Sequence, residues 1–289
     1  MYYRITGHIL EISGEEPGLN VPGFSPFVFD AILTVQPLIS IQLNQKVAGR
    51  EAGPLYQFTI EEGNCEFLKC KDSYLIRWKE PDGTSWLMDI EYKEGRFVGC
   101  TDMNKDTDAH IISFSIWIAF GIAALHYQTV AIHASAIIHN GKSILFLGES
   151  GTGKSTQSGL WLQHIPNTEL LNDDSPIICI ANNEIAQVYG SPWSGKTPCY
   201  KDKQSAVAAF IRLRQAPNNS IRRLRTIEAI AALQPSLPPI LASEPILVEL
   251  MLDCLSAILK QIPVYALDCL PDIGAVNLVY FTLKDEGRL

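Results

Sequence analysis

A short segment near the middle of the chain, FLGESGTGKST, has the composition and spacing of a loop that binds phosphate groups. Its glycines free the backbone from the constraint of a Cβ atom, so consecutive N–H groups can turn inward around an anion. The pattern Gly-x4-Gly-Lys-Ser predicts that the amides and a helix N-terminus bind phosphates, Lys154 binds β and γ oxygens, and the Ser155 hydroxyl binds Mg²⁺. The nucleotide-binding residues predicted from this loop are Gly148, Glu149, Ser150, Gly151, Thr152, Gly153, Lys154, Ser155 and Thr156.

Two adjacent carboxylates, Asp173 and Asp174, follow the next short apolar run and come one helix after Ser155. In folds that carry such a loop, the ends of neighbouring strands meet beside it. One carboxylate can then reach Mg²⁺ while its neighbour accepts a proton from an attacking hydroxyl. The composition of NDDSP is also typical of a turn, because Asn and Asp side chains form hydrogen bonds with their own backbone. The upstream loop favours the catalytic interpretation, and adjacency alone leaves open which carboxylate has which role.

Other polar residues near these motifs have two interpretations each. His133 precedes the loop by one strand, and a lone histidine in an apolar run is more often a packed core residue than a catalytic one. The segment GSPWSGK, which ends at Lys196, suits a rigid loop that offers a ring face and a cation to a nucleotide, or a plain surface turn. An arginine-rich stretch is either a phosphate- or substrate-binding face or a solvated one. Its members are Arg212, Arg214, Arg222, Arg223 and Arg225.

The elements that must position these residues follow from the hydrophobic pattern. The apolar run 143–147 predicts a buried strand before the loop, and 155–163 predicts a helix after it. A further strand at about 130–138 is joined to the first by Asn140-Gly141, which predicts an antiparallel hairpin and hence a mixed sheet. Beyond the loop, the pattern predicts helices over 204–214 and 245–261 and a strand in the arginine-rich stretch.

The chain divides into two predicted domains. Residues 1–108 contain short alternating apolar runs separated by turn signals, among them Pro81-Asp-Gly83, and this part is expected to be mostly antiparallel β. Residues 109–289 carry the phosphate loop. The fold class expected is therefore α/β (α+β), with a β-rich domain before a mixed-sheet nucleotide-binding domain. The apolar segment 111–125 is shorter than the roughly 20 residues that a membrane span needs, which favours a buried core helix over an interfacial one.

Composition narrows the class of protein. A formal net charge of −8 and a pI near 5.3 oppose a nucleic-acid partner, which requires concentrated Lys and Arg. The first residues show no basic region followed by a long apolar one, so we expect a cytoplasmic protein without a membrane partner. Seven cysteines without a CxxC pair fit reduced thiols better than disulfides. Zinc bound by Cys65, Cys70 and Cys100 is the less favoured alternative, because the spacing does not suit it.

Taken in chain order, the motifs HASAI, NGKSILFLGESGTGKST, LLNDD and YGSPWSGK resemble the C-terminal domain of the HPr kinase/phosphorylase family, and more closely the HPr-kinase-like proteins found beside small gene clusters in bacteria. The resemblance covers residues 130–200. It implies a P-loop kinase domain whose nucleotide fold is shared with the ATP-dependent phosphoenolpyruvate carboxykinases. HPr kinases carry a Glu-x-Arg-Gly-type segment after the Asp pair, where this chain has VYGSPWSGK, so neither phosphorylase activity nor HPr as substrate is implied.

The resemblance also implies roles for individual residues. His133 and Lys154 would be active-site residues, Asp173 the base that deprotonates a hydroxyl, and Asp174 a metal ligand together with Ser155. The activity expected is a Mg²⁺- and ATP-dependent transfer of the γ-phosphoryl group to a hydroxyl acceptor, on a serine of a protein or peptide or on a small molecule. The alternatives are an ATP-binding regulatory or scaffold protein and a simple NTPase. HPr kinases form oligomers, so the resemblance also implies a homo-oligomer.

Overall fold

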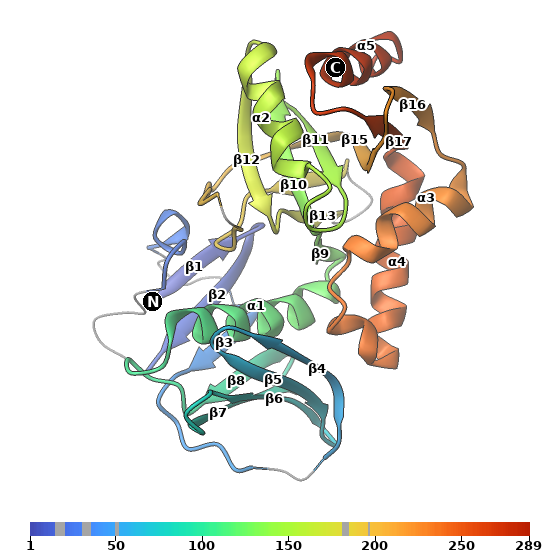
Figure 1. Ribbon diagram of the computed structural model, residues 1–289. Coiled ribbons are helices and arrows are strands. Elements are labelled where there is room, and N and C mark those ends of the chain that lie inside the picture. Colours follow the sequence, from blue (N-terminus) through green and yellow to red (C-terminus); the bar gives the residue numbers. More distant parts are fainter. Residues whose placement is uncertain (15–20, 31–35, 50–51, 181–184, 196) are drawn as a thin grey trace. The chain divides into compact units, whose positions relative to one another are not determined.

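The structure is a computed structural model that describes residues 1–289 except 15–20, 31–35, 50–51, 181–184 and 196 (Figure 1). The described residues form an α/β protein with five α-helices and two mixed sheets of eight and nine strands. The chain divides into two compact units. One comprises Met1–His126 and Pro239–Glu249, and the other comprises Tyr127–Pro238 and Leu250–Leu289.

The first unit is built on the eight-stranded sheet, whose order is β1-β2-β3-β8-β7-β6-β5-β4. Most neighbours are antiparallel, as the sequence predicts, but β3 pairs in parallel with both β2 and β8. The turn at 81–83 joins β6 to β7 in an antiparallel pair. The strands are β1 (Tyr2–Ile5), β2 (His8–Ser13), β3 (Ile39–Gln42), β4 (Pro54–Ile60), β5 (Gly63–Lys69), β6 (Ser73–Lys79), β7 (Ser85–Lys93) and β8 (Arg96–Thr101).

Helix α1 (Ala109–Leu125) lies across one face of this sheet (Figure 1). It is buried along most of its length. The Trp78 indole N–H donates to the Ser115 hydroxyl at 2.9 Å, and the Phe58 and Phe114 rings lie 5.2 Å apart. The prediction of a core helix is confirmed, and none of the helices in the described part of the chain is long and apolar enough to cross a membrane. Because α1 packs here, the first compact unit continues past residue 108, where the sequence placed the domain boundary.

The second unit is built on the nine-stranded sheet, which has the path β12-β10-β11-β15-β14-β13-β9, with β17 beside β15 and β16 beside β17. The hairpin β10–β11 is antiparallel and β11–β15 is parallel, so the prediction of a mixed sheet is confirmed. The strands are β9 (Thr129–Ala131), β10 (Ala134–His139), β11 (Lys142–Leu147), β12 (Thr168–Asp174), β13 (Ile177–Cys179), β14 (Gln187–Tyr189), β15 (Gln204–Gln215), β16 (Ser220–Arg223) and β17 (Val264–Cys269).

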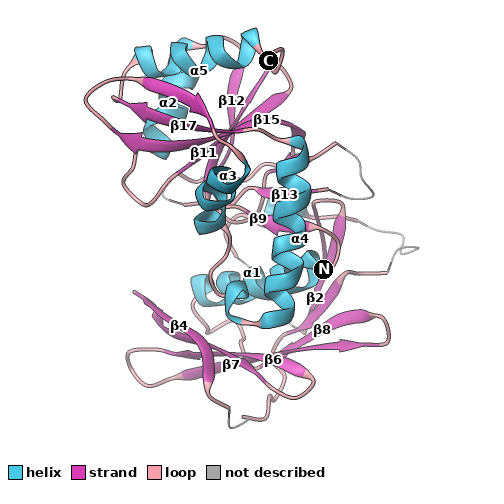
Figure 2. Cartoon of the chain, turned by 90° about the vertical axis from the view of Figure 1, so that its right-hand side faces the viewer, coloured by secondary structure: helices cyan, strands magenta, loops and turns pink. Residues whose placement is uncertain are grey.

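Helices α2 (Lys154–His164) and α5 (Ile273–Asp285) lie side by side over this sheet (Figure 2). Their apolar side chains form one core with the sheet, in which Trp161 of α2 is fully buried. Alternate residues of β15 divide between the two faces of the sheet, as the period of a strand requires. Ile211 and Leu213 face this core, whereas Arg212 and Arg214 face a pocket that residues of α3 (Thr226–Leu233) also line. Helix α4 (Pro245–Gln261) has the predicted bounds.

Two predictions for this unit are wrong in detail. Residues 204–214 form strand β15 and not a helix. The alanines of QSAVAAFIRLRQ favour a helix by intrinsic propensity, but β15 has neighbours on both sides and is buried on both faces over its middle, so packing overrides propensity. The single strand predicted over 130–138 is two strands, β9 and β10, which pair with different partners. His133 lies in the break between them.

Candidate functional site

The predicted phosphate loop joins the end of β11 to the start of α2. Gly151 and Gly153 have φ values of 80° and 105°, a region that side chains with a Cβ avoid. A Cβ on Gly148 would overlap the Thr152 hydroxyl, which donates to the Glu149 carbonyl at 2.8 Å. The loop therefore has the tight backbone that the spacing of its glycines predicts, and it opens directly into the N-terminus of α2.

Lys154 folds back over this loop. Its ammonium group donates to the Gly148 carbonyl at 2.8 Å and to the Glu149 carbonyl at 3.4 Å, and lies 2.9 Å from Nε2 of His133. Burial lowers the pKa of Lys154, and the carboxylates of Asp174, Asp173 and Glu149 oppose that shift. A cation that is partly desolvated and placed at the mouth of an amide-lined loop is suited to bind phosphate oxygens.

Ser155 and Asp173 are in direct contact. The Ser155 hydroxyl, on the first turn of α2, lies 3.0 Å from Oδ2 and 3.2 Å from Oδ1 of Asp173, near the end of β12. Asp173 is buried, and its main-chain carbonyl accepts hydrogen bonds from the neighbouring loop. A hydroxyl and a carboxylate are hard oxygen donors of the kind that Mg²⁺ prefers. The donor set therefore fits a magnesium ion.

His133 lies between Lys154 and Asp174. Its Nδ1 is 3.2 Å from Oδ1 of Asp174, and both side chains are 45% exposed. An ammonium group can only donate, so the Lys154 contact makes Nε2 the hydrogen-bond acceptor and puts the imidazole proton on Nδ1, facing Asp174. The break between β9 and β10 leaves the His133 backbone outside the sheet, and its N–H donates to the Ser236 carbonyl at 2.7 Å. His133 is thus an exposed residue in contact with Lys154 and Asp174, and not a packed core residue.

Asp174 has an unusual backbone. Its φ is 131°, whereas the other non-glycine residues with positive φ in the described part of the chain lie between 47° and 57°. A bridge to Ser194 holds it, and Gly195 packs so closely that a Cβ there would come within 3.1 Å of the Asp174 Cβ. Strained non-glycine backbone of this kind costs about 1–3 kcal/mol and is concentrated at functional sites.

This strain predicts an inverted order of stability. We expect Asp174→Gly to be more stable than Asp174→Ala by about 1 kcal/mol, because glycine adopts this φ without strain and that gain exceeds its larger unfolded-state entropy. Urea unfolding of the two variants measures the difference. Glu169 of the same strand is the control, since Glu169→Gly should be less stable than Glu169→Ala. If Asp174→Gly is less stable than Asp174→Ala, the backbone of Asp174 is not strained.

The contacts of the segment GSPWSGK differ from those predicted. Trp193 is only 8% exposed, which does not favour the interpretation in which its ring offers a face to a nucleotide. The segment instead braces the end of β12, where the Gly195 N–H donates to the Asp173 carbonyl at 2.6 Å and the Ser194 hydroxyl to the same atom at 3.1 Å. Lys196, the predicted cation of this segment, lies outside the described residues.

Two contacts of the site, one made by Asn172 and one by Arg212, are not evident in the sequence. The buried Asn172 side chain donates to the carbonyls of Trp193 and Cys199 and accepts from the Ser175 N–H, so it ties β12 to the bracing segment. Arg212 is paired with Glu149 of the phosphate loop. The sequence names Arg212 as one of five candidate arginines, but the assignment of a helix to 204–214 gave no reason to place it beside the loop.

The remaining candidates lie apart from the loop. Arg222 and Arg223 make ion pairs with Glu228 and Glu286, and Arg225 caps α3 through its backbone N–H. Such exposed pairs fit the interpretation as a solvated face. All seven cysteines are free thiols, and within the described residues no three His, Cys, Asp or Glu side chains are grouped so that they could hold a metal ion by themselves. The zinc alternative therefore has no structural support.

Comparison of the chain with models of protein families gave no match, and a search of curated proteins likewise found no similar one. The chemistry that this site can perform must therefore be inferred from the site residues and their geometry.

Proposed function

We propose that the protein is a Mg²⁺- and ATP-dependent kinase that transfers the γ-phosphoryl group to a hydroxyl acceptor. The observation that carries the proposal is the direct hydrogen bond between Ser155 and Asp173, formed beside a loop over which Lys154 is folded. Loop amides and Lys154 would bind the phosphates. Ser155 and Asp173 would hold Mg²⁺, which would neutralise negative charge on the phosphates. The mixed sheet supports the finer proposal of an HPr kinase/phosphoenolpyruvate carboxykinase type of nucleotide fold.

The same contacts lead us to propose the reverse of the carboxylate roles that the resemblance implies. Asp173 is buried against Ser155, a position that suits a metal ligand, whereas Asp174 is half-exposed and faces the imidazole N–H of His133. In this proposal Asp174 accepts the proton of the acceptor hydroxyl. The hydroxyl oxygen forms the new bond to Pγ, the bond from Pγ to the β–γ bridging oxygen breaks, and ADP leaves. His133 is a positioning residue that orients Asp174.

Lys154 would change partners during binding. Its ammonium group, which here contacts the Gly148 carbonyl and His133, would turn to the β and γ oxygens of ATP. Nε2 of His133 would then be released, while its Nδ1–H still faces Asp174. Catalysis would rest on positioning and on neutralisation of charge.

The experiment that tests this function follows γ-labelled phosphate from Mg-ATP into an extract of the source organism, which is then divided by a size filter. We expect labelling that Lys154→Ala reduces about 100-fold or more, since one lost donor to the transferred group costs that much. Lys142→Ala is the matched control, because Lys142 stands at the opposite end of β11.

Each outcome separates one function from the others. Label in the large fraction would mean a protein or peptide acceptor, and label in the small fraction a metabolite. If labelled phosphate is released from ATP at the same rate with and without extract, the protein is an NTPase. Bound ATP with neither transfer nor release would contradict the kinase and leave an ATP-binding regulator.

A further inference from the structure

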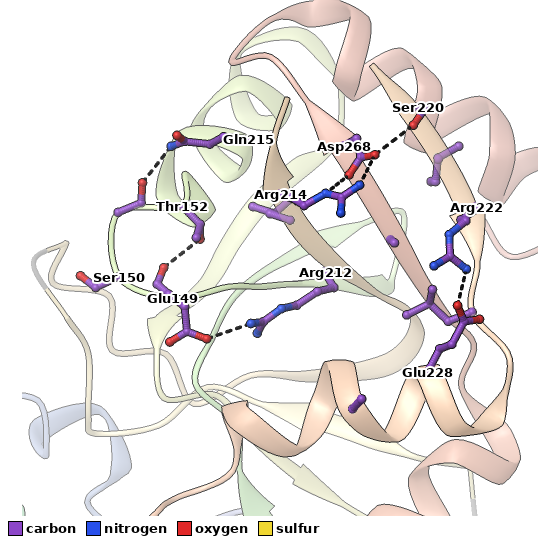
Figure 3. Close-up of a pocket in the computed structure, with 16 residues that line it drawn as sticks. Glu149, Ser150, Thr152, Arg212, Arg214, Gln215, Ser220, Arg222, Glu228 and Asp268 are labelled. Atoms are coloured by element: carbon purple, nitrogen blue, oxygen red, sulfur yellow. Dashed lines mark hydrogen bonds and ion pairs between the residues drawn. The ribbon is translucent and has the colours of Figure 1, made fainter. Parts of the chain in front are cut away.

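A pocket of about 910 Å³ lies beside the phosphate loop, over the carboxyl ends of β15 and β17 (Figure 3). The loop residues Glu149–Thr152 form one wall. The end of β15 forms another, with Arg212 directly opposite Leu147 in the register of β11 and β15. Arg212 therefore stands beside the last strand residue before the loop, and its side chain extends toward Glu149 (Figure 3).

Three arginines line this pocket, and each is paired with a carboxylate. Arg214 binds Asp268 through two hydrogen bonds at 2.6 and 2.7 Å, and Arg222 lies 2.8 Å from Glu228. Neither of these pairs includes a residue of the phosphate loop. The third pair differs, because Arg212 binds Oε1 of Glu149, a residue of the phosphate loop itself, at 2.8 Å.

The Glu149 carboxylate lies near Arg212, Lys154 and the His133 imidazole. Arg212 lowers the pKa of Glu149 most, and His133 and Lys154 lower it further, so all three positive or protonatable groups act on this one carboxylate. Arg212 also lowers the pKa of Lys154, whereas the nearby carboxylates raise it. The Glu149 side chain is 72% exposed, whereas that of Arg212 is 23% exposed. The carboxylate therefore has solvent beside it into which it can turn, whereas the guanidinium is mostly enclosed.

We propose that the Glu149 carboxylate is an internal substitute for a phosphate and that Arg212 is a catalytic residue, which exchanges Glu149 for the γ-phosphoryl group of bound ATP. This inference rests on the proposed kinase function. Arg212 would approach the transferred group from the β15 side while Lys154 and Mg²⁺ approach from the others. A planar guanidinium can bind two phosphate oxygens at once and hold them as charge spreads over them during transfer. Without ATP, the ion pair with Glu149 keeps this cation at the loop.

Binding of ATP and ADP in the presence of Mg²⁺ tests the exchange separately from turnover. We expect Arg212→Gln to bind ATP about tenfold more weakly with ADP affinity unchanged, and to lower kcat about 100-fold or more. Arg212→Lys keeps the charge and one ion pair but not the bidentate contact, so intermediate values are expected. Glu149→Gln frees Arg212 and should bind ATP about 2- to 5-fold more tightly, the worth of an exposed ion pair.

Arg214→Gln is the matched control, because Arg214 lies two residues along the same face of β15 and pairs outside the loop. It should behave as the wild type. If Arg212→Gln and Arg212→Lys both match Arg214→Gln in kcat and in the ratio of ATP to ADP affinity, Arg212 is not a phosphate ligand and the inference fails while the kinase function stands. If the wild type binds no ATP, both proposals fail.

Discussion

Asp173→Asn and Asp174→Asn are expected to impair phosphoryl transfer in two different ways. Asp173 contacts Ser155 and is buried, so its replacement should raise the Mg²⁺ concentration for half-maximal rate about 10- to 100-fold. Asp174 faces His133 and is half-exposed, so its replacement should lower kcat about 10²- to 10⁴-fold, the usual contribution of a general base, with an almost unchanged Mg²⁺ requirement.

Rates measured over a range of Mg²⁺ concentrations at saturating ATP distinguish the two effects. Asp253→Asn is the matched control, because Asp253 is an exposed carboxylate on α4. The opposite result, a metal defect in Asp174→Asn and a loss of kcat in Asp173→Asn, would restore the assignment that the family resemblance implies. Equal defects in both parameters for both variants would mean that the two carboxylates act on the metal together.

Asn172→Ala is expected to have the largest effect on stability, about 3–5 kcal/mol. The Asn172 side chain is fully buried, and its loss would remove its bonds to the Ser175 N–H and to the carbonyls of Trp193 and Cys199, although the Trp193 carbonyl would keep its bond from the Ser191 hydroxyl. Buried polar groups without partners cost about 1–3 kcal/mol each. The melting temperature should fall by about 10 °C.

The same change should reduce transfer even at temperatures where the variant is folded, because Asn172 precedes Asp173 and joins β12 to the segment that braces it. Thermal melts and rates at a temperature below both transitions measure the two effects. Asn64→Ala is the control, since Asn64 makes only an exposed hydrogen bond with Thr59 at 3.1 Å among its side-chain contacts described here. A loss of less than 1 kcal/mol for Asn172→Ala would show that water or rearrangement replaces these bonds.

Much of the candidate site follows from the sequence because its signals are local. The phosphate loop depends on glycines that must adopt positive φ or approach closely, and on a strand and helix whose hydrophobic patterns directly flank it. The hairpin depends on Asn140-Gly141, and the core helix at 109–125 on its apolar content. Each of these features is encoded within a short stretch of chain, so spacing and composition predict it without knowledge of distant contacts.

Other features of the site could be decided only by the tertiary structure, because they depend on contacts between residues far apart in the chain. Sheet neighbours override the helix propensity of 204–214, and strand β15 then brings Arg212 to Glu149, which is 63 residues away. Packing also sets which carboxylate meets Ser155 and which meets His133, because a strand directs successive side chains to opposite faces. The sequence by itself thus determined the phosphate loop and the pair of carboxylates, whereas long-range strand pairing determined their partners and the strained backbone of Asp174.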